Sequence, residues 1–304
     1  MTDATPALNL RIAVVLACHN RRETTLAALR HLFAQELPAD VCLIAFLVDD
    51  GSSDGTAAAV IENFPRVRVL HGDGTLFWSG GMRWAFGEAL AEGFDHYLWL
   101  NDDTMLRPDA IRTLLATSDE LTARGFARLI IVGATGDPET GETTYGGVAR
   151  STRFHPLKFH LLEPASSPQP CATMNGNVVL ISRDAAETTG NISQVFSHVL
   201  GDFDYGLRAR KLGCAIWVAP GYAGSCGKNG VQNTWRDPSL SLHESIRRLL
   251  SVKGLPLGCY RCFAKEHGGP LWPLFWLMPY LHAVFFLVVK RLARGRRTLQ
   301  TMES

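Results

Sequence analysis

Two adjacent carboxylates follow a strand-like segment near the middle of the chain. An apolar run leads into Asn101, Asp102, Asp103 and Thr104, and the next Lys or Arg is Arg107. Burying such a pair in a crevice costs free energy unless a cation or hydrogen-bond donors compensate it. A hard divalent ion with oxygen ligands, such as Mg²⁺ or Mn²⁺, would do so and would also neutralise a diphosphate. A turn or a helix N-cap explains the same residue types equally well.

A second acidic pair, Asp49 and Asp50, ends an earlier apolar run and precedes a stretch rich in Gly and Ser. Glycines permit a tight backbone at the end of a strand, and Ser53 or Asp54 can cap the helix that follows. Capping explains one acidic residue but not Asp49 and Asp50 as well. Carboxylates at this place can accept hydrogen bonds from the imide N–H of a pyrimidine or from ribose hydroxyls.

The elements that must position these groups alternate along the first half of the chain. Apolar runs predict strands at 11–17, 41–48, 67–70 and 96–100, and helical spacing predicts helices at 22–35, 54–64, 80–92 and beyond 107. Four such units predict an α/β fold with a Rossmann-like, mostly parallel sheet flanked by helices. Ligands bind such sheets at the carboxyl ends of the strands, and both acidic pairs fall there.

The composition excludes several classes of protein. The 304 residues are 46% hydrophobic and 19% charged, with a formal net charge of +1, so we expect a globular protein without a nucleic-acid partner. The N-terminus lacks the features of a secretory signal and the seven cysteines are an odd, scattered set, which indicates reduced thiols in the cytoplasm. Cys259 and Cys262, with His267 nearby, form a lone Cys-x-x-Cys, a weak indication of zinc.

The C-terminal stretch 241–304 is expected to be a helical, apolar and basic extension. Residues 271–289 contain no charged side chain, and five basic residues follow: Lys290, Arg291, Arg294, Arg296 and Arg297. Pro273 and Pro279 should interrupt this run, leaving 280–289 as the unbroken helical candidate, so a transmembrane span is disfavoured. Peripheral contact of 271–297 with a membrane is one interpretation. Packing of two helices on the catalytic core explains the pattern equally well.

Five motifs occur in order along the chain: Cys18-His-Asn-Arg21, Asp49-Asp-Gly-Ser-Ser-Asp-Gly-Thr56, Gly80-Gly-Met-Arg83, Leu100-Asn-Asp-Asp-Thr104 and Asp202-Phe-Asp-Tyr-Gly-Leu-Arg-Ala-Arg210. The set resembles the family 2 inverting glycosyltransferases of the GT-A fold, especially the bacterial rhamnosyltransferase-like branch, over about residues 10–235. The resemblance implies a GT-A-like catalytic domain over 1–240 that binds a nucleotide-diphosphate sugar.

The resemblance also implies a role for each motif. Contacts to the donor nucleotide sugar are expected from Asn20, Asp49, Asp50, Arg83, Asn101 and Asp102. An exposed helical Arg is the alternative for Arg83. Asn101 and Asp103 take the first and last positions of the family's Asp-x-Asp element, so Asp103 is expected to bind the divalent metal. Related enzymes often have a His after the last strand that completes the metal shell, but 218–229 contains none, and Lys228 could supply positive charge directly.

Asp202 matches the general base of the family's Glu-Asp-x-Asp element, although Gly201 replaces the usual Glu. An inverting transfer needs one base, opposite the leaving group, to take the proton of the acceptor hydroxyl. Asp204 is expected to cap the following helix or to pair with Arg208 one turn on. If Asp202 is itself the cap, it has no catalytic part.

The resemblance implies a metal-assisted hexosyltransferase that moves a sugar from dTDP-rhamnose or a UDP-sugar to a hydroxyl of a glycan or lipid-linked acceptor. Together with the C-terminal stretch, it leads us to expect a role in bacterial envelope polysaccharide synthesis at the inner face of the cell membrane. The sugar and acceptor pocket would include Trp78, Asn175 and Asn177, though a buried Trp is as often part of a core. Two alternatives stay open. A sugar nucleotidyltransferase would need a Gly-rich loop after strand one, which 18–22 lacks; the other is a non-catalytic sugar-binding protein of the same fold.

Overall fold

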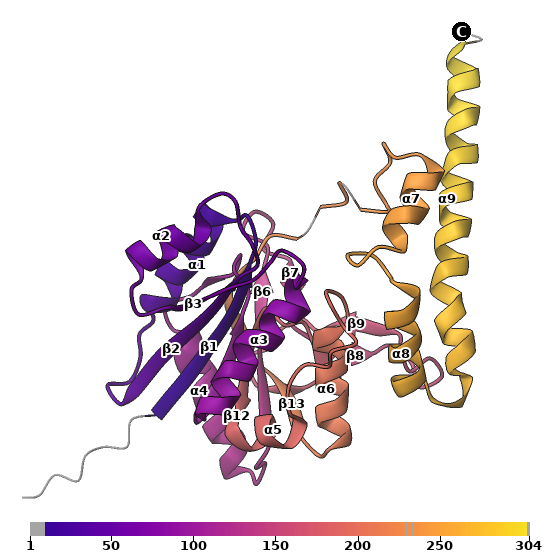
Figure 1. The fold of residues 1–304 in the computed structure, drawn as a ribbon. Coiled ribbons are helices and arrows are strands. Elements are labelled where there is room, and N and C mark those ends of the chain that lie inside the picture. The colour runs from indigo at the N-terminus through magenta and orange to yellow at the C-terminus, as the bar shows by residue number, and fades with distance from the viewer. Residues whose placement is uncertain (1–9, 229, 233, 303–304) are drawn as a thin grey trace, which may run out of the picture. The chain divides into compact units, whose positions relative to one another are not determined.

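The computed structural model describes residues 10–228, 230–232 and 234–302, which form two compact units (Figure 1). The N-terminal unit comprises the chain up to Ala149 and Phe159–Lys228. The C-terminal unit comprises Arg150–Lys158 and the residues that follow Lys228. This division lies near the boundary expected after residue 240, and it adds the segment 150–158 to the C-terminal unit.

The N-terminal unit is built on a mixed sheet of strand order β10-β13-β6-β12-β4-β1-β2-β3. The strands on this path are β1 (Leu10–Cys18), β2 (Val41–Asp49), β3 (Arg68–His71), β4 (His96–Leu100), β6 (Leu129–Gly136), β10 (Gln169–Pro170), β12 (Val178–Ser182) and β13 (Ala215–Ser225). Strands β1 to β4 run parallel, as do β6 and β13, whereas β12 is antiparallel to β4 and β6. The predicted α/β fold with a mostly parallel sheet is confirmed.

Shorter strands complete the unit. They are β5 (Met105–Leu106), β7 (Thr143–Tyr145), β8 (Gly147–Arg150), β9 (Phe159–Leu161) and β11 (Thr173–Met174). Strand β5 pairs with β13 and β7 pairs with β6, while β11, β8 and β9 form a separate small sheet. The pairing of β5 with β13 brings the segment after β4 to the end of β13, a contact that matters for the site.

Helices cover both faces of the sheet. Helices α1 (Arg22–Phe33), α2 (Thr56–Asn63) and α4 (Ala110–Ala123) pack on one face, and α3 (Phe77–Glu92), α5 (Arg183–Thr189) and α6 (Gly201–Lys211) pack on the other. Along β1, Ile12 and Val14 face the first set, whereas Ala13 and Val15 face the second. A strand buried on both faces reads as a continuous apolar run, which is why the sequence pattern located these strands.

Helix α3 begins at Phe77, three residues before the start expected at Gly80. A Cβ atom on Gly81 would lie 2.8 Å from the Cβ atom of Ala17. The glycine therefore lets α3 lie directly on β1, and it serves helix–sheet packing rather than the start of the helix.

The C-terminal unit contains α7 (Leu242–Leu249), α8 (Leu257–His267), a 3₁₀ turn at Gly269–Leu271 and the long helix α9 (Trp272–Met302). The expected interruption at Pro279 is wrong, because α9 continues through it. Proline has no N–H to donate to the carbonyl four residues earlier. The hydroxyl of Tyr260 donates to that carbonyl, on Phe275, at 3.3 Å. Pro273 lies in the first turn, where its missing N–H costs nothing.

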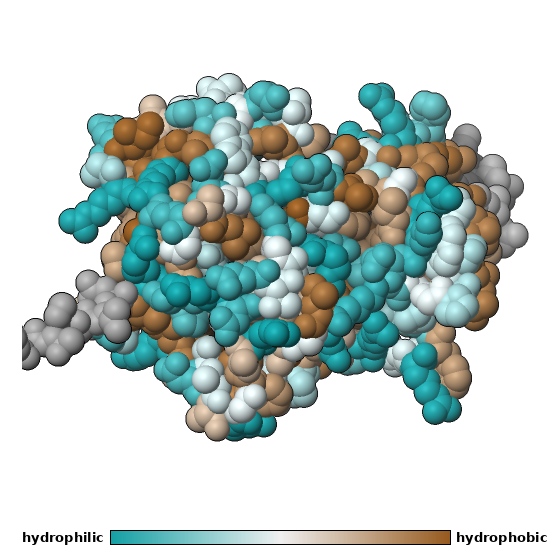
Figure 2. Space-filling view, turned by 60° about the horizontal axis from the view of Figure 1, so that its bottom comes forward, coloured by the Kyte–Doolittle hydropathy of each residue, from teal (hydrophilic) through white to brown (hydrophobic). Residues whose placement is uncertain are grey.

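One face of α9 is apolar and exposed. Its residues follow helical spacing, and they include Leu274, Leu277, Leu281 and Phe285. Figure 2 shows the resulting hydrophobic surface at the right of the view. The stretch Gly269–Leu287 is long and apolar enough to cross a membrane by length and composition, and 22% of it is buried.

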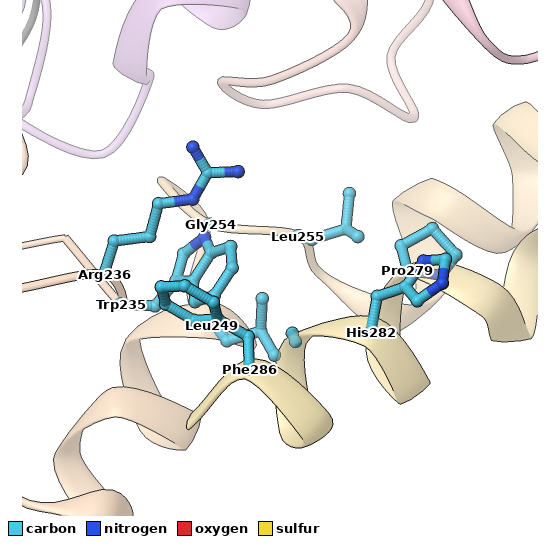
Figure 3. A pocket seen from close by; sticks show the side chains of 9 residues that line it. Trp235, Arg236, Leu249, Gly254, Leu255, Pro279, His282 and Phe286 are labelled. Atoms are coloured by element: carbon cyan, nitrogen blue, oxygen red, sulfur yellow. The ribbon is translucent and has the colours of Figure 1, made fainter. Parts of the chain in front are cut away.

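The same helix borders a cavity of about 590 Å³ within the C-terminal unit (Figure 3). The lining residues are Trp235, Arg236, Leu249, Gly254, Leu255, Pro279, His282, Ala283 and Phe286. Trp235 meets Phe286 edge to face, with ring centroids 6.2 Å apart, and the guanidinium of Arg236 lies over the Trp235 ring. The cavity is thus largely apolar with a cationic group beside it.

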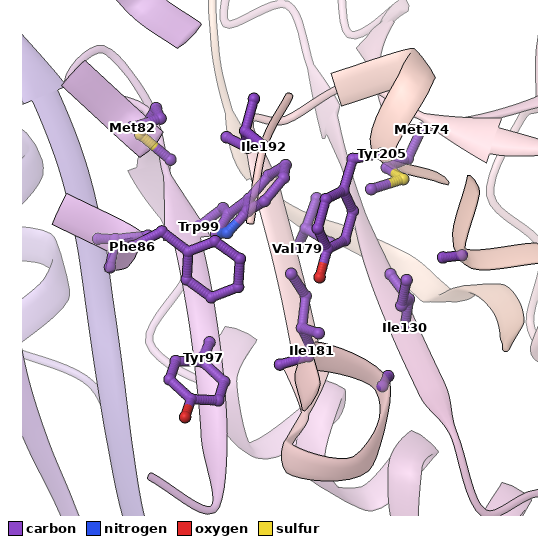
Figure 4. Close-up of a cluster of buried hydrophobic side chains, with 14 of the residues drawn as sticks. Met82, Phe86, Tyr97, Trp99, Ile130, Met174, Val179, Ile181, Ile192 and Tyr205 are labelled. Carbon is purple, nitrogen blue, oxygen red and sulfur yellow. The ribbon is translucent and has the colours of Figure 1, made fainter. Parts of the chain in front are cut away.

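The core beneath α3 offers a test of the packing. Phe86 is fully buried against Tyr97, Trp99 and Tyr205, with ring centroids 5.3 to 6.1 Å apart (Figure 4). Replacing Phe86 with Ala should lower the free energy of unfolding by about 3–5 kcal/mol through lost burial and the cavity left behind. Urea denaturation measures this quantity.

Trp84, on the same helix, provides the matched control. It is 37% exposed, so Trp84→Ala should change the free energy of unfolding by roughly 1 kcal/mol or less. Equal losses in the two variants would contradict the packing described for α3.

Candidate functional site

Polar residues from four strands meet at one edge of the sheet. Cys18 and Asp49 are in register at the carboxyl ends of the parallel strands β1 and β2. Strand β12 is antiparallel, and its first residue, Val178, pairs with Leu100 at the carboxyl end of β4. The start of β12 therefore lies at the same edge, and Asn177, which precedes it, joins the acidic residues there.

The loops after β1 and β2 are tied together by side chains expected to bind the nucleoside. The Oδ1 atom of Asn20 accepts a hydrogen bond from the backbone N–H of Ser53 at 2.8 Å, and the N–H of Asn20 donates to the Ser52 hydroxyl at 2.8 Å. The Oδ1 atom of Asp49 accepts from the N–H of Ser52 at 3.0 Å. Asn20 and Asp49 thus hold one rigid loop pair at the edge of the sheet.

The carboxylate of Asp50 is directed at the start of α3. Its Oδ1 atom accepts from the N–H of Gly74 at 2.9 Å, and its Oδ2 atom accepts from the N–H of Phe77 at 2.8 Å. The residue is only 4% exposed. In the described structure Asp50 therefore fixes the segment that carries Trp78 into the site, and its contact with a nucleoside stays a prediction.

Arg21 lies against both carboxylates of the strand-end motif. Its Nη1 atom is 3.0 Å from Oδ1 of Asp102 and 2.7 Å from Oδ2 of Asp103. The compensating cation that such a buried pair requires thus comes from a residue 81 positions earlier in the sequence. Burial raises the pKa of Asp102 to about 7, with Arg21 opposing the shift and Asp103 adding to it. The sequence motif that contains Arg21 does not reveal its contact with Asp102 and Asp103.

A second group surrounds the expected general base. The indole N–H of Trp78 donates to Oδ1 of Asn101 at 2.7 Å, and the backbone N–H of Gly176 donates to Oδ2 of Asp202 at 3.0 Å. A side chain at Gly176 would collide with the ring of Trp78. The structure therefore brings Trp78, Asn101 and Asp202 together around one glycine, a relation that sequence spacing did not reveal.

The ionisation of Asp202 suits a base. Burial raises the pKa of this half-buried carboxyl to about 6, while hydrogen bonds from the N–H groups of Phe203 and Gly176 limit the rise. A carboxylate with a pKa near the working pH combines a large deprotonated fraction with a useful affinity for protons. Asp204 takes the structural role expected of it, as its Oδ2 atom pairs with Nε of Arg208 at 2.8 Å.

Backbone strain gathers at the same place. In the described part of the chain, positive φ angles outside glycine occur at Asn20 (51°), Phe77 (54°) and Leu200 (69°). Such conformations cost roughly 1–3 kcal/mol each and tend to persist at functional sites, where the surroundings enforce them. Each of the three lies within two residues of a site residue: Arg21, Trp78 or Asp202.

Arg83 and Asn175, which were expected in the donor and sugar pockets, form hydrogen bonds with the backbone of loops. Nη1 of Arg83 donates to the backbone carbonyls of Ser193 and Phe196 at 3.4 and 3.3 Å, so it anchors the segment leading to α6. Burial lowers the pKa of Arg83. Asn175 donates its backbone N–H to the carbonyl of Gly146 at 2.9 Å. Among the described contacts, none joins Arg83 or Asn175 to the acidic residues.

The donor atoms present fit a hard divalent ion shared with a diphosphate. The Oδ2 atom of Asp102 is buried without a hydrogen-bond partner in the described structure, and it lies beside the half-buried carboxylate of Asp103. Mg²⁺ sites often use one or two carboxylates, substrate phosphates and water. The described residues contain no group of three His, Cys, Asp or Glu side chains that could hold an ion alone.

Cys226 directly follows β13, in the region where related enzymes often have a metal-binding His and this chain has none. Its Sγ atom lies 3.5 Å from Oδ1 of Asp103, and Nδ2 of Asn177 lies 3.6 Å from the same sulfur. Burial, followed by the charge of Asp103, raises the pKa of the Cys226 thiol to about 12. The group is therefore a neutral thiol that packs against Asp103.

Comparisons with known proteins reveal two mycobacterial relatives of this chain. The chain is 27% identical over 184 residues to an uncharacterised protein of Mycobacterium tuberculosis, covering 57% of this chain and 64% of that relative's length. It is 24% identical over 265 residues to the N-acetylglucosaminyl-diphospho-decaprenol L-rhamnosyltransferase of Mycobacterium tuberculosis, covering 80% of this chain and 81% of the relative.

The fold has a counterpart among solved structures. The structure of S. aureus TarS in complex with UDP-GlcNAc superposes with a TM-score of 0.54 at 12% identity, covering 84% of this chain and 71% of that one. The model of the family described as glycosyl transferase family 2 matches residues 13–202, which is more than half of the chain and extends from β1 to Asp202. This chain is a member of glycosyl transferase family 2, and it has the GT-A-like fold and rhamnosyltransferase-like relatives expected from its sequence.

Proposed function

We propose that this chain is an inverting, metal-assisted hexosyltransferase that moves a sugar from dTDP-rhamnose or a UDP-sugar to a hydroxyl of a glycan or lipid-linked acceptor. The observation that carries the proposal is the position of Asp202, which is held by Gly176 beside the Trp78–Asn101 pair. Similarity to the mycobacterial N-acetylglucosaminyl-diphospho-decaprenol L-rhamnosyltransferase and to TarS in complex with UDP-GlcNAc supports a nucleotide-sugar donor and a lipid-diphosphate acceptor.

In the proposed reaction Asp202 accepts the proton of the acceptor hydroxyl while the oxygen forms a bond to the anomeric carbon. The bond from that carbon to the donor diphosphate breaks on the opposite face, so the configuration inverts and a nucleoside diphosphate leaves. Asn20, Asp49 and Asn101 would orient the nucleoside. A divalent ion at Asp103, with Asp102 beside it, would offset the charge of the leaving diphosphate.

Replacing Asp202 with Asn tests the assignment of the base. The amide keeps the shape of the side chain but cannot take a proton at neutral pH, so kcat should fall by about 10²–10⁴-fold. Affinity for UDP or dTDP should stay within about threefold of the wild-type value, because the substitution leaves the contacts with the nucleotide in place. Transfer assays and calorimetric titration measure the two quantities.

Asp184→Asn is the matched control, since Asp184 is an exposed acidic residue in the first turn of α5. It should transfer sugar at the wild-type rate. If Asp202→Asn also keeps the wild-type rate, Asp202 is not the base.

The pH dependence of kcat/KM follows from the raised pKa of Asp202. A base with a pKa of about 6 is protonated, and therefore inactive, below that pH. We expect kcat/KM to rise with pH and to level off above about pH 6.5, falling about tenfold per unit on the acid side. Far-UV circular dichroism over the same range separates titration from unfolding. A flat profile between pH 4.5 and 7 would be inconsistent with an Asp202 that titrates near 6.

We also propose that α9 binds the inner face of the cell membrane, close to a lipid-linked acceptor, in envelope polysaccharide synthesis. The exposed apolar face of α9 suits the acyl boundary of a bilayer. The sequence continues with the basic residues from Lys290 to Arg297, and each Lys or Arg near an anionic surface contributes about 1 kcal/mol.

Vesicle flotation tests this contact. Wild-type protein should float with vesicles that contain phosphatidylglycerol, and less with neutral ones. A variant carrying Leu281→Glu and Phe285→Glu, which are 58% and 69% exposed, should lose most of the binding. Ile61→Glu, at an exposed apolar position of α2, should float like the wild type. Equal flotation of the double variant would exclude α9 as the contact.

A further inference from the structure

The guanidinium of Arg21 makes an unusual contact with the proposed metal site. A single nitrogen, Nη1, donates to Oδ1 of Asp102 and to Oδ2 of Asp103. In the described structure, the other guanidinium nitrogens of Arg21 carry no hydrogen bond, and the side chain is 43% exposed. Arg21 precedes the first residue of α1 and directly follows Asn20, whose φ is positive.

Arg21 stabilises a pair of carboxylates that would otherwise repel each other. Asp102 is only 6% exposed, and its second oxygen has no partner in the described structure. Burial opposes the charge of Arg21, but both carboxylates raise its pKa, so the guanidinium is a permanent cation. The free protein thus already places one positive charge beside the carboxylates, where a divalent ion would bring two.

A divalent ion bound to Asp103 would lie close to this guanidinium. Oδ2 of Asp103 is 2.7 Å from Nη1 of Arg21, and two cations at such distances from one oxygen repel strongly. A metal ion therefore binds Asp103 more tightly when the guanidinium has moved to another anion. Arginine is suited to a bidentate contact with phosphate oxygens, and its remaining N–H groups point to no other partner in the described structure.

We propose that Arg21 is a built-in counter-ion that holds Asp102 and Asp103 before the donor arrives and then transfers to the donor diphosphate, so that metal and nucleotide bind together. The inference rests on the proposed function of the site, since it takes Asp103 as the metal ligand. It makes Arg21 a donor-binding residue that couples the two ligands: the metal alone binds weakly, and the nucleotide strengthens the binding of the metal.

Titration with Mn²⁺, followed by the electron paramagnetic resonance of the free ion, tests the coupling without any turnover. Without nucleotide, Arg21→Gln should bind Mn²⁺ about tenfold more tightly than the wild type, because the competing cation is gone. With UDP or dTDP, the wild-type affinity for Mn²⁺ should rise by at least about tenfold. Arg21→Gln should lose most of that increase. A protein-free titration corrects for Mn²⁺ bound by the nucleotide itself.

Two further variants sharpen the test. Arg22→Gln removes the same charge one residue away, where the described contact is with Glu23 rather than the site, and it should behave like the wild type. Arg21→Lys keeps the charge without the planar fork, so it should still suppress binding of Mn²⁺ alone but bind UDP or dTDP less tightly. Thermal unfolding confirms that each variant is folded.

Three results would overturn the proposal in different ways. Unchanged Mn²⁺ affinity in Arg21→Gln would show that Arg21 does not compete with the metal. Binding of UDP or dTDP without binding of Mn²⁺ in any variant would remove the metal role of Asp103 and the coupling, while leaving a nucleotide-sugar transferase. Absence of binding by either nucleotide would overturn the proposed function itself.

Discussion

The cost of burying carboxylates at one edge of a sheet is the constraint on which this structure depends. Three of the acids there, Asp50, Asp102 and Asp202, are compensated by donors from a distant segment. Asp50 uses the backbone of 74–77, Asp102 uses Arg21, and Asp202 uses the N–H of Gly176. These donors lie on the segments that carry the other site residues. The contacts that compensate the buried charges therefore also bring the site residues together.

Much of the fold could be predicted because it follows from local pattern. The strands of the sheet are buried on both faces and appear as apolar runs, and parallel pairing then places Asp49 and Asn101 at a common edge. The antiparallel direction of β12 has no local signal, and this direction is what brings Asn177 to that edge. A pattern of hydrophobicity reveals which residues are buried but not which way a strand runs.

The remaining differences arise from contacts between residues far apart in the sequence. Arg21 meets carboxylates more than 80 positions away, and the hydroxyl of Tyr260 satisfies the carbonyl that Pro279 leaves without a donor. A glycine is required at position 81 because α3 lies close to Ala17 there, and not because a helix begins there. The local preferences of Pro279 and of the Gly80-Gly81 pair predict a helix break and a helix start, and tertiary contacts override both.

The central claim is that the edge of the sheet between Asn20 and Asp202 binds a nucleoside diphosphate. Thermal unfolding of the wild-type protein with UDP, dTDP, ADP or GDP, each with and without Mn²⁺, measures this directly. We predict that UDP or dTDP stabilises the fold, by about 2.7 kcal/mol at a hundredfold excess over Kd, and more so with Mn²⁺. Stabilisation by none of the four nucleotides, with or without metal, would contradict the account.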